Sequence, residues 1–499
     1  MMRKAGILMP VFSLPGPYGI GCFSKEAYRF IDFLSDAGQS YWQILPLGPT
    51  SYGDSPYQSF STFAGNPYFL DPETLRKEGL LTRTDLHEYR TSPDEKIDYA
   101  FLYKERFALL RKAFRNFNTD YPEYEEYKEK ESDWLYDYSL FMALKDAHDG
   151  ESFVSWEEKY RLRDEQALKE FADEHTDDIE FYSFIQYEFS SQWGALKKYA
   201  NDKGIEIIGD IPIYVSADSS DVWCDPRLFQ MDGSEKPVAV AGCPPDGFSA
   251  DGQLWGNPLY RWDYHEKTGF DWWIRRIKKC TELYDVIRID HFRGFDEYYS
   301  IPAGDKTAAN GHWEPGPGMK LFNAIKEALG DVQIIAEDLG FMTDSVKELV
   351  KDSGFPNMRV LEFAFDSRDS SSAGTADNVY LPFNYDRNCV VYTGTHDNET
   401  LRGWLSSITP KELSNVKNYL GLPKDAKKSD IVDPFIRAAL SSVADLCVIP
   451  MWDYLGLPNS ARINTPSTVG GNWQWRCPAE ELTKRLANDI EKKTKIYGR

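Results

Sequence analysis

The chain has 499 residues, a formal net charge of −22 and an isoelectric point near 4.9. Such an acidic surface repels phosphate backbones, so we expect no nucleic-acid partner. Every apolar run is shorter than the roughly 20 residues of a membrane span, and the N-terminal run MMRKAGILMP is too short for a signal peptide. The seven cysteines are scattered singly without a CxxC pair, which argues against a disulfide framework or a zinc site. We therefore expect a soluble, cytoplasmic protein without a membrane partner.

Eight short runs of β-branched and other apolar residues recur along the chain, and they are typical of parallel strands buried on both faces. They cover residues 5–11, 40–47, 205–211, 285–289, 332–336, 358–365, 389–392 and 446–451. Eight is the number of strands in a closed barrel. The sequence therefore predicts an α/β protein with a (β/α)8 TIM-barrel fold, formed by a single catalytic domain over residues 1–499.

The spacing between these runs is uneven, which predicts large insertions. About 155 residues separate the second run from the third, far more than one helix requires. This gap contains apolar residues at helical spacing, so we expect an inserted helix-rich subdomain over 72–200. Residues 228–262 are rich in glycine, proline and aromatic residues, which predicts an inserted active-site loop region.

Three acidic residues follow apolar runs directly. Asp290 lies in DVIRIDHFRG (285–294), Glu337 in VQIIAEDLG (332–340) and Asp397 in CVVYTGTHDNET (389–400). Polar residues at the C-terminal ends of barrel strands form the active site of this fold, so the three carboxylates should converge. Convergent carboxylates without a cluster of metal ligands indicate chemistry on a glycosidic bond.

Each carboxylate also has a purely structural interpretation. Arg288 shares a strand face with Asp290, and a neighbouring guanidinium should lower the pKa of a nucleophilic carboxylate; the pair could instead only stabilise the barrel. Glu337 in an apolar setting should have the raised pKa of a general acid, or it could cap the next helix. Asp397 could hold sugar hydroxyls together with the adjacent His396, or it could be a helix N-cap.

A metal site is the main chemical alternative. His291 and His396 both follow strand runs and have carboxylates nearby, as in zinc hydrolases with a barrel fold. Such sites usually need a third histidine or an HxH pair, and the sequence has no HxH. We therefore predict neither a metal nor another cofactor.

The three carboxylate motifs resemble the core motifs of the 4-α-glucanotransferases, the amylomaltases or disproportionating enzymes of the wider α-amylase clan. Further segments that resemble this family are 44–50, 52–59, 209–214, 244–246, 252–258, 461–466 and 471–473. Together they extend over essentially the whole chain. The resemblance implies a barrel without the separate C-terminal β-domain of most amylases, and the sequence ends about 50 residues after the eighth run.

The resemblance also implies a role for individual residues. Asp290 matches the nucleophile, Glu337 the acid/base and Asp397 the residue that stabilises the transition state. Matches to substrate-binding positions are Ser55, Tyr57, Asp210, Trp255, Arg288, His291, His396, Asn464 and Pro466. Gly247 departs from relatives that carry an aromatic residue there, so acceptor stacking at that position is not implied.

The activity implied by the resemblance is transfer of α-1,4-glucan segments by a retaining double displacement, with α-1,4-glucans and maltooligosaccharides as binding partners. A hydrolysing α-amylase or α-glucosidase is the alternative among enzymes. A glucan-binding protein on an inactive barrel is the alternative from another class. We expect a monomer or a homodimer.

Overall fold

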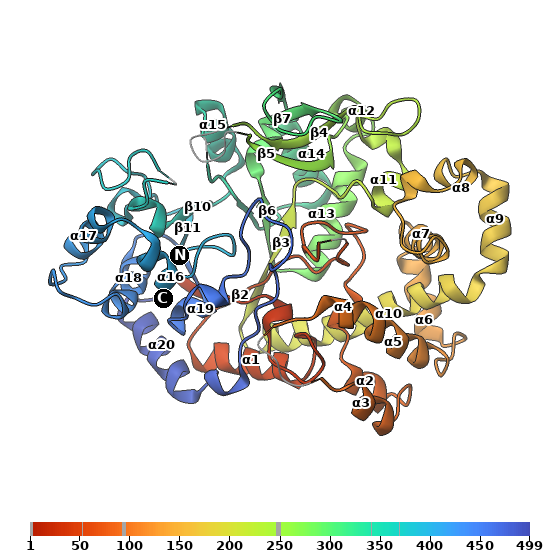
Figure 1. Cartoon of the computed structure of the whole chain (residues 1–499), viewed down its shortest axis with the longest axis horizontal. Helices are drawn as coiled ribbons and strands as arrows, with labels where there is room; N and C mark the ends of the chain where they lie inside the picture. Colours follow the sequence, from red (N-terminus) through yellow and green to blue (C-terminus); the bar gives the residue numbers. More distant parts are fainter. Residues whose placement is uncertain (1–2, 52, 92–95, 246–250, 341, 369) are drawn as a thin grey trace.

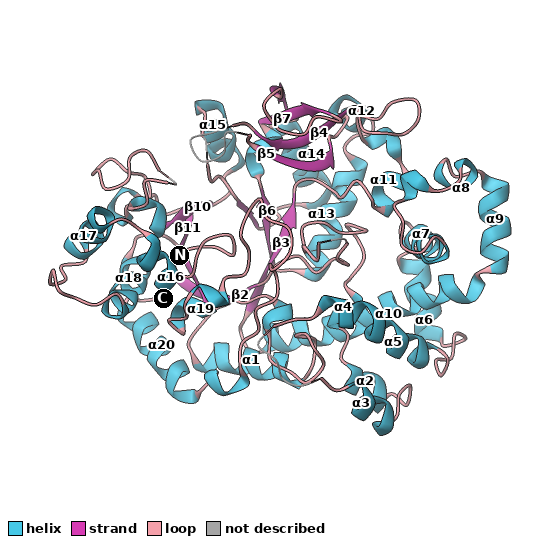
Figure 2. Ribbon diagram, viewed as in Figure 1, coloured by secondary structure: helices cyan, strands magenta, loops and turns pink. Residues whose placement is uncertain are grey.

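The computed structural model describes residues 3–51, 53–91, 96–245, 251–340, 342–368 and 370–499. At its centre eight parallel strands form a closed barrel in chain order, and the eighth pairs with the first (Figures 1 and 2). This confirms the predicted (β/α)8 fold. The strands are β1 (Lys4–Leu8), β2 (Tyr41–Gln43), β3 (Glu206–Pro212), β6 (Val286–Asp290), β9 (Ile334–Ala336), β10 (Asn357–Val360), β11 (Cys389–Tyr392) and β12 (Leu446–Pro450).

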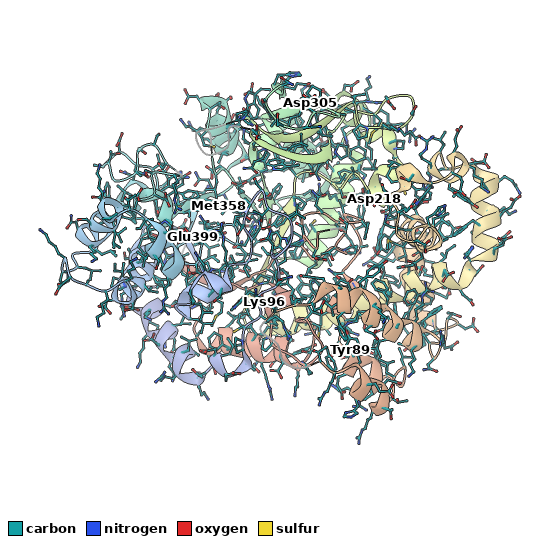
Figure 3. The ribbon with its side chains drawn as sticks, in the orientation of Figure 1. Tyr89, Lys96, Asp218, Asp305, Met358 and Glu399 are labelled. Atoms are coloured by element: carbon teal, nitrogen blue, oxygen red, sulfur yellow. The ribbon has the colours of Figure 1, made fainter. Side chains whose placement is uncertain are left out.

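The barrel strands are buried on both faces, as their continuous apolar runs predict. All four residues of β11 are buried, and Met358 on β10, labelled in Figure 3, has no exposed surface. Packing against the barrel also restricts residue size on β3. A Cβ atom at Gly209 would lie 2.1 Å from the ring of Tyr284, so only glycine fits there.

Amphipathic helices surround the barrel. In α1 (Lys25–Asp36) the buried residues Ala27, Phe30, Ile31 and Leu34 recur at helical spacing, and the Ser24 side chain caps the first turn by accepting from the Glu26 N–H. The other covering helices are α13 (Asp271–Leu283), α14 (Met319–Leu329), α15 (Asp344–Ser353), α16 (Leu401–Ser407), α17 (Pro410–Tyr419), α18 (Ser429–Ser441), α19 (Met451–Tyr454) and α20 (Lys484–Ile496). After β12 the described residues form α19, two 3-10 turns, α20 and irregular segments, with an isolated bridge from Trp475 to Lys96.

A group of helices lies between β2 and β3, on the right of Figure 1 in orange and yellow. It comprises α2 (Pro72–Lys77), α3 (Arg83–Tyr89), α4 (Tyr99–Phe101), a π-helical turn (Leu102–Arg106), α5 (Phe107–Phe114), α6 (Pro122–Lys130), α7 (Leu135–Ala147), α8 (Glu158–Arg161), α9 (Glu165–Glu174) and α10 (Thr176–Asp202). The long helix α10 returns the chain to the barrel. Its residues Phe189 and Trp193 pack against Phe23 with ring centroids 5.3 and 5.2 Å apart.

A second sheet, which we call the roof sheet, lies at the top of Figure 2. It is antiparallel with the order β5 (Gln253–Pro258), β4 (Ala239–Cys243), β7 (Glu297–Pro302) and β8 (His312–Pro315). No pattern in the sequence predicts this sheet. Residues 228–262, expected as a loop region, contain two of its strands, and the other two follow β6. Glycine is required where β4 and β5 approach, because a Cβ at Gly242 would lie 2.1 Å from the Gln253 carbonyl oxygen.

Among the described residues, no helix has the length and apolar character needed to cross a bilayer. The structure also contains no disulfide bond between any of the seven cysteines, all of which are described.

Candidate active site

A cleft with a volume of about 590 Å³ opens where the C-terminal ends of the barrel strands meet the roof sheet. Most of the residues expected to contact substrate line it, although they come from segments far apart in the chain. The expected residues found in the lining are Ser55, Tyr57, Trp255, Asp290, His291, His396, Asp397, Asn464 and Pro466. The structure therefore brings together the strand ends that the sequence analysis expected to converge.

Asp290 and Glu337 lie at the ends of neighbouring strands. Ile289 on β6 pairs with Ala336 on β9. Asp290 and Glu337 are the next residues of these two segments, so they lie at the same height along the barrel axis. Glu337 is only 9% exposed, and its Oε2 and Oε1 accept hydrogen bonds of 2.7 Å from the N–H groups of His291 and Leu339. His291 donates from a left-handed backbone conformation with φ of 54°, which ends β6. The turn after β6 thus holds the carboxyl group that follows β9.

Burial gives these two groups different proton affinities. Burial raises the pKa of Glu337 to about 8, and the nearby Asp290 carboxylate contributes to this shift. Burial also raises the pKa of Asp290 to about 6, although the Arg288 guanidinium opposes the shift. The expectation that Arg288 sets a low pKa for Asp290 is therefore wrong, because desolvation outweighs the ion pair. Between these values Asp290 is ionised and Glu337 is protonated.

Arg288 forms hydrogen bonds with two carboxylates at once. Its Nη1 donates to both oxygens of Asp210 at 2.7 Å and to Asp290 Oδ1 at 3.0 Å. Tyr57 donates its hydroxyl to Asp210 Oδ2 at 2.8 Å. Asp210 is fully buried and Arg288 is 3% exposed, so both lie beneath the cleft. Neither residue is among those that line the cleft; they support Asp290 and Tyr57, and a direct sugar contact by either stays a prediction.

Asp397 faces the cleft from the segment after β11. Its side chain is 43% exposed, its Oδ1 accepts from Asn464 Nδ2 at 2.6 Å, and its Oδ2 lies 3.4 Å from His396 Nε2. The His396 ring stacks on Tyr57 with centroids 5.2 Å apart and planes 16° apart.

The helix-cap interpretations of two carboxylates are wrong. The Thr400 side chain caps α16 by accepting from Gly403 N–H, so Asp397 is not its N-cap. Thr343 caps α15, so Glu337 does not cap the helix that follows it. Neither carboxylate therefore caps the helix that follows it. Asp397 lines the cleft, whereas the buried Glu337 is not among the lining residues and lies beside His291, which is.

Apolar and aromatic side chains enclose the cleft from opposite sides. Trp255 on β5 packs its ring against the edge of His291, with centroids 4.8 Å and planes 87° apart. Pro466 and the exposed Val469 line the other rim. Gly247, whose effect on acceptor stacking was questioned, lies outside the described residues.

Several lining residues were not singled out from the sequence. Gln58, Tyr214, Asn257 and Trp473 line the cleft, and the Trp473 ring lies 5.9 Å from Tyr57 and 6.0 Å from His396. All four fall within or beside segments that carry the family resemblance, which was the available signal. The described residues contain no group of three or more histidine, cysteine or acidic side chains that could hold a metal ion. The lining of the cleft offers carboxylate, imidazole, amide and hydroxyl groups together with aromatic rings.

Comparison with known proteins gives one consistent result. The model of the 4-alpha-glucanotransferase family matches residues 9–483. A 4-alpha-glucanotransferase of Clostridium butyricum is 51% identical to this chain, and the match covers 98% of this chain and 100% of the relative. A 4-alpha-glucanotransferase of Solanum tuberosum is 40% identical, and the match covers 100% of this chain and 86% of the relative. Among solved structures, an amylomaltase from Streptococcus agalactiae in complex with acarbose superimposes with a TM-score of 0.95 at 42% identity, covering 100% of this chain and 99% of that one. The chain belongs to the 4-alpha-glucanotransferase family.

Proposed function

We propose that this chain is a 4-α-glucanotransferase that moves α-1,4-glucan segments from a donor glucan to the 4-hydroxyl of an acceptor glucan or glucose. The observation that carries the proposal is the pair of carboxyl groups at neighbouring strand ends, Asp290 and Glu337. Burial gives them pKa values of about 6 and about 8, so one is charged and the other protonated near neutral pH. A retaining glycosidase mechanism needs this combination of nucleophile and general acid.

In the first step, a carboxylate oxygen of Asp290 attacks the anomeric carbon of the donor while Glu337 protonates the departing glycosidic oxygen. A covalent β-glucosyl ester forms on Asp290, and the shortened glucan leaves with the proton of Glu337. Asp397, held by Asn464, faces the cleft and is the candidate for binding the hydroxyls of the distorted sugar. Tyr57, fixed by Asp210, offers its ring to the same sugar.

In the second step, the ionised Glu337 takes the proton from the 4-hydroxyl of an acceptor. The acceptor oxygen attacks the anomeric carbon, the ester bond to Asp290 breaks, and an α-1,4 linkage is restored. Transfer wins over hydrolysis when the acceptor sugar excludes water from the ester. Trp255 on one rim, with Pro466 and Val469 on the other, supplies apolar surface for this exclusion.

Incubation with maltotriose tests the reaction type. A transferase converts it into glucose and a ladder of longer maltooligosaccharides, while the number of reducing ends stays nearly constant, since each cleaved bond is replaced. Chromatography of the products and a reducing-end assay measure both quantities. A rise in reducing ends that matches bond cleavage would establish the α-amylase or α-glucosidase alternative, and glucan binding without turnover would establish the non-catalytic one.

We also propose that the protein acts in the cytoplasm as a monomer or homodimer. The seven cysteines without a disulfide bond support a reducing compartment. The net charge of −22 supports a partner other than nucleic acid.

A further inference from the structure

An extended segment after β12 aims two polar side chains at Asp397. It follows the 3-10 turn Asn459–Ala461, and its residues Ala461 and Ile463 are 2% and 1% exposed. Because side chains alternate along an extended chain, Arg462 and Asn464 point away from that apolar contact. The Asn464 side chain donates a hydrogen bond to the Asp397 carboxylate, and the Arg462 side chain contacts the Asp397 main chain.

The guanidinium of Arg462 bridges two backbone carbonyl groups through the two donors of one edge. Its Nη2 donates to the Asp397 oxygen at 2.7 Å, and its Nε donates to the Asn464 oxygen at 2.7 Å. The Asn464 N–H in turn donates to the His396 oxygen at 3.1 Å. Arg462 thus ties together the main chains of the two residues whose side chains form the Asp397–Asn464 hydrogen bond.

The same segment also holds the far end of the loop that carries Asp397. Asn459 Oδ1 accepts from the Thr400 N–H at 3.1 Å, and Asn459 Nδ2 donates to Glu399 Oε1 at 2.6 Å. Residues 396–400 are therefore attached at both ends to residues 459–464. Asp397 precedes helix α16, so its position is held by this attachment together with the local turn in which Asn398 Oδ1 accepts from the Thr395 N–H at 2.8 Å.

Only arginine suits the central place in this arrangement. Two N–H groups of one planar guanidinium reach two carbonyl oxygens at once, which a single ammonium group does with poorer geometry. Burial lowers the pKa of Arg462, while Glu399, Asp397 and Glu362 oppose that shift and favour its charged form. The charge strengthens both hydrogen bonds to the carbonyl oxygens.

We propose that Arg462 is a positioning residue for the transfer reaction, whose two hydrogen bonds fix Asp397 and Asn464 relative to each other. This inference rests on the proposed function, since it assigns to Arg462 the support of the residue that stabilises the transition state. The expected signature is a loss of kcat larger than the change in KM, because Arg462 acts through Asp397. A displacement of about 1 Å at a reacting centre costs about a hundredfold in rate.

The test compares Arg462→Lys with Arg402→Lys. Arg402 is a matched control, because it lies on α16, is exposed, and also donates to a backbone carbonyl, that of Gly456 at 3.1 Å. For Arg462→Lys we expect kcat on maltotriose to fall by about ten- to a hundredfold with KM changed much less. Arg402→Lys should keep the parent values. Near-ultraviolet circular dichroism verifies folding, and if Arg462→Lys is unfolded, Arg462→Gln replaces it, since its amide nitrogen keeps a neutral N–H donor group.

A double-mutant cycle separates positioning from general stabilisation. If Arg462 acts through Asp397, Arg462→Lys should cost less than about twofold in rate when Asp397→Asn is already present, measured with α-glucosyl fluoride. Equal costs in both backgrounds, or an unchanged kcat in folded Arg462→Lys, would overturn the inference. A parent enzyme that makes no maltooligosaccharide ladder would instead overturn the proposed function, so the two failures are distinguishable.

Discussion

Asp210 connects Tyr57 and Arg288 beneath the cleft, so its replacement by asparagine should change both stability and pH dependence. Asp210 and Asp290 accept from the same Arg288 Nη1 atom at 2.7 and 3.0 Å, so the accepting oxygens are no more than about 6 Å apart. At that distance and an effective dielectric constant of about 20, their repulsion is about 3 kcal/mol before Arg288 screens it. Removing the charge should therefore lower the pKa of Asp290 by about one to two units.

The pH profile of kcat/KM provides the assay. In the parent, activity should rise through about pH 6 as Asp290 ionises and fall through about pH 8 as Glu337 loses its proton. In Asp210→Asn the acid limb should move to lower pH, because the neighbouring negative charge that favours protonated Asp290 is gone. The alkaline limb should move less. The rate at the optimum should fall by about a hundredfold, since Tyr57 and Arg288 lose their shared anchor.

The same variant should also be less stable, by about 3 kcal/mol, because the buried Arg288 keeps only one carboxylate partner. Asp221→Asn is the control: Asp221 is also buried, but its carboxylate accepts from the N–H and hydroxyl of Thr62. It should lose stability without moving the acid limb. An acid limb at the same pH in Asp210→Asn and in the parent would refute the electrostatic link between Asp210 and Asp290.

Further expectations concern the two proposed catalytic carboxylates, the cleft-lining residue Trp255 and metals. Asp290→Asn should lose several orders of magnitude in kcat while remaining folded, and near-normal turnover would contradict its assignment as nucleophile. Glu337→Gln should be impaired strongly on maltotriose but less on α-glucosyl fluoride, whose leaving group needs little protonation; an equal loss on both would exclude the general-acid role. Trp255→Ala should raise the ratio of hydrolysis to transfer with a rate loss of about fivefold, whereas an unchanged ratio with a lower melting temperature would indicate packing alone. EDTA treatment and desalting should leave activity unchanged, and restoration by zinc or calcium of a lost activity would prove this wrong.

The barrel could be predicted because its strands are buried on both faces. A run such as Cys389–Tyr392 is apolar throughout, so its sequence reveals it without any partner. The end of a strand was harder to predict where apolar residues continue beyond it into a turn. The run 358–365 was expected to be one strand, but β10 ends at Val360 and Leu361–Ala364 form a 3-10 turn. The Glu362 N–H there donates to the Thr393 oxygen, a contact that the local sequence does not reveal.

The roof sheet could not be predicted because its strands lack such a signature. β8 has four residues with none buried, and β5 contains a glycine and ends in proline. The two pairs β5–β4 and β7–β8 join into one sheet through β4 and β7, which lie on either side of β6 in the chain, so no local pattern specifies the four-stranded sheet.

At the site, sequence patterns placed Asp290 and Glu337 at strand ends, as the structure does, but not the balance of burial and charge around Asp290. That balance depends on Asp210, which belongs to β3 and approaches Arg288 only in the folded barrel. The sequence shows Arg288 two residues before Asp290, but it does not reveal that the guanidinium also donates hydrogen bonds to the Asp210 carboxylate.

The roof sheet also constrains how this enzyme can evolve. Two of its strands precede β6 and two follow it, so the strand that ends in Asp290 is enclosed within the segment of chain that builds the sheet. Because β4 pairs with β7, an insertion within either strand would disturb a pairing made by the segment on the other side of β6. A substitution of a β5 side chain that lines the cleft, such as Trp255, changes the substrate-facing surface without breaking that β4–β7 link.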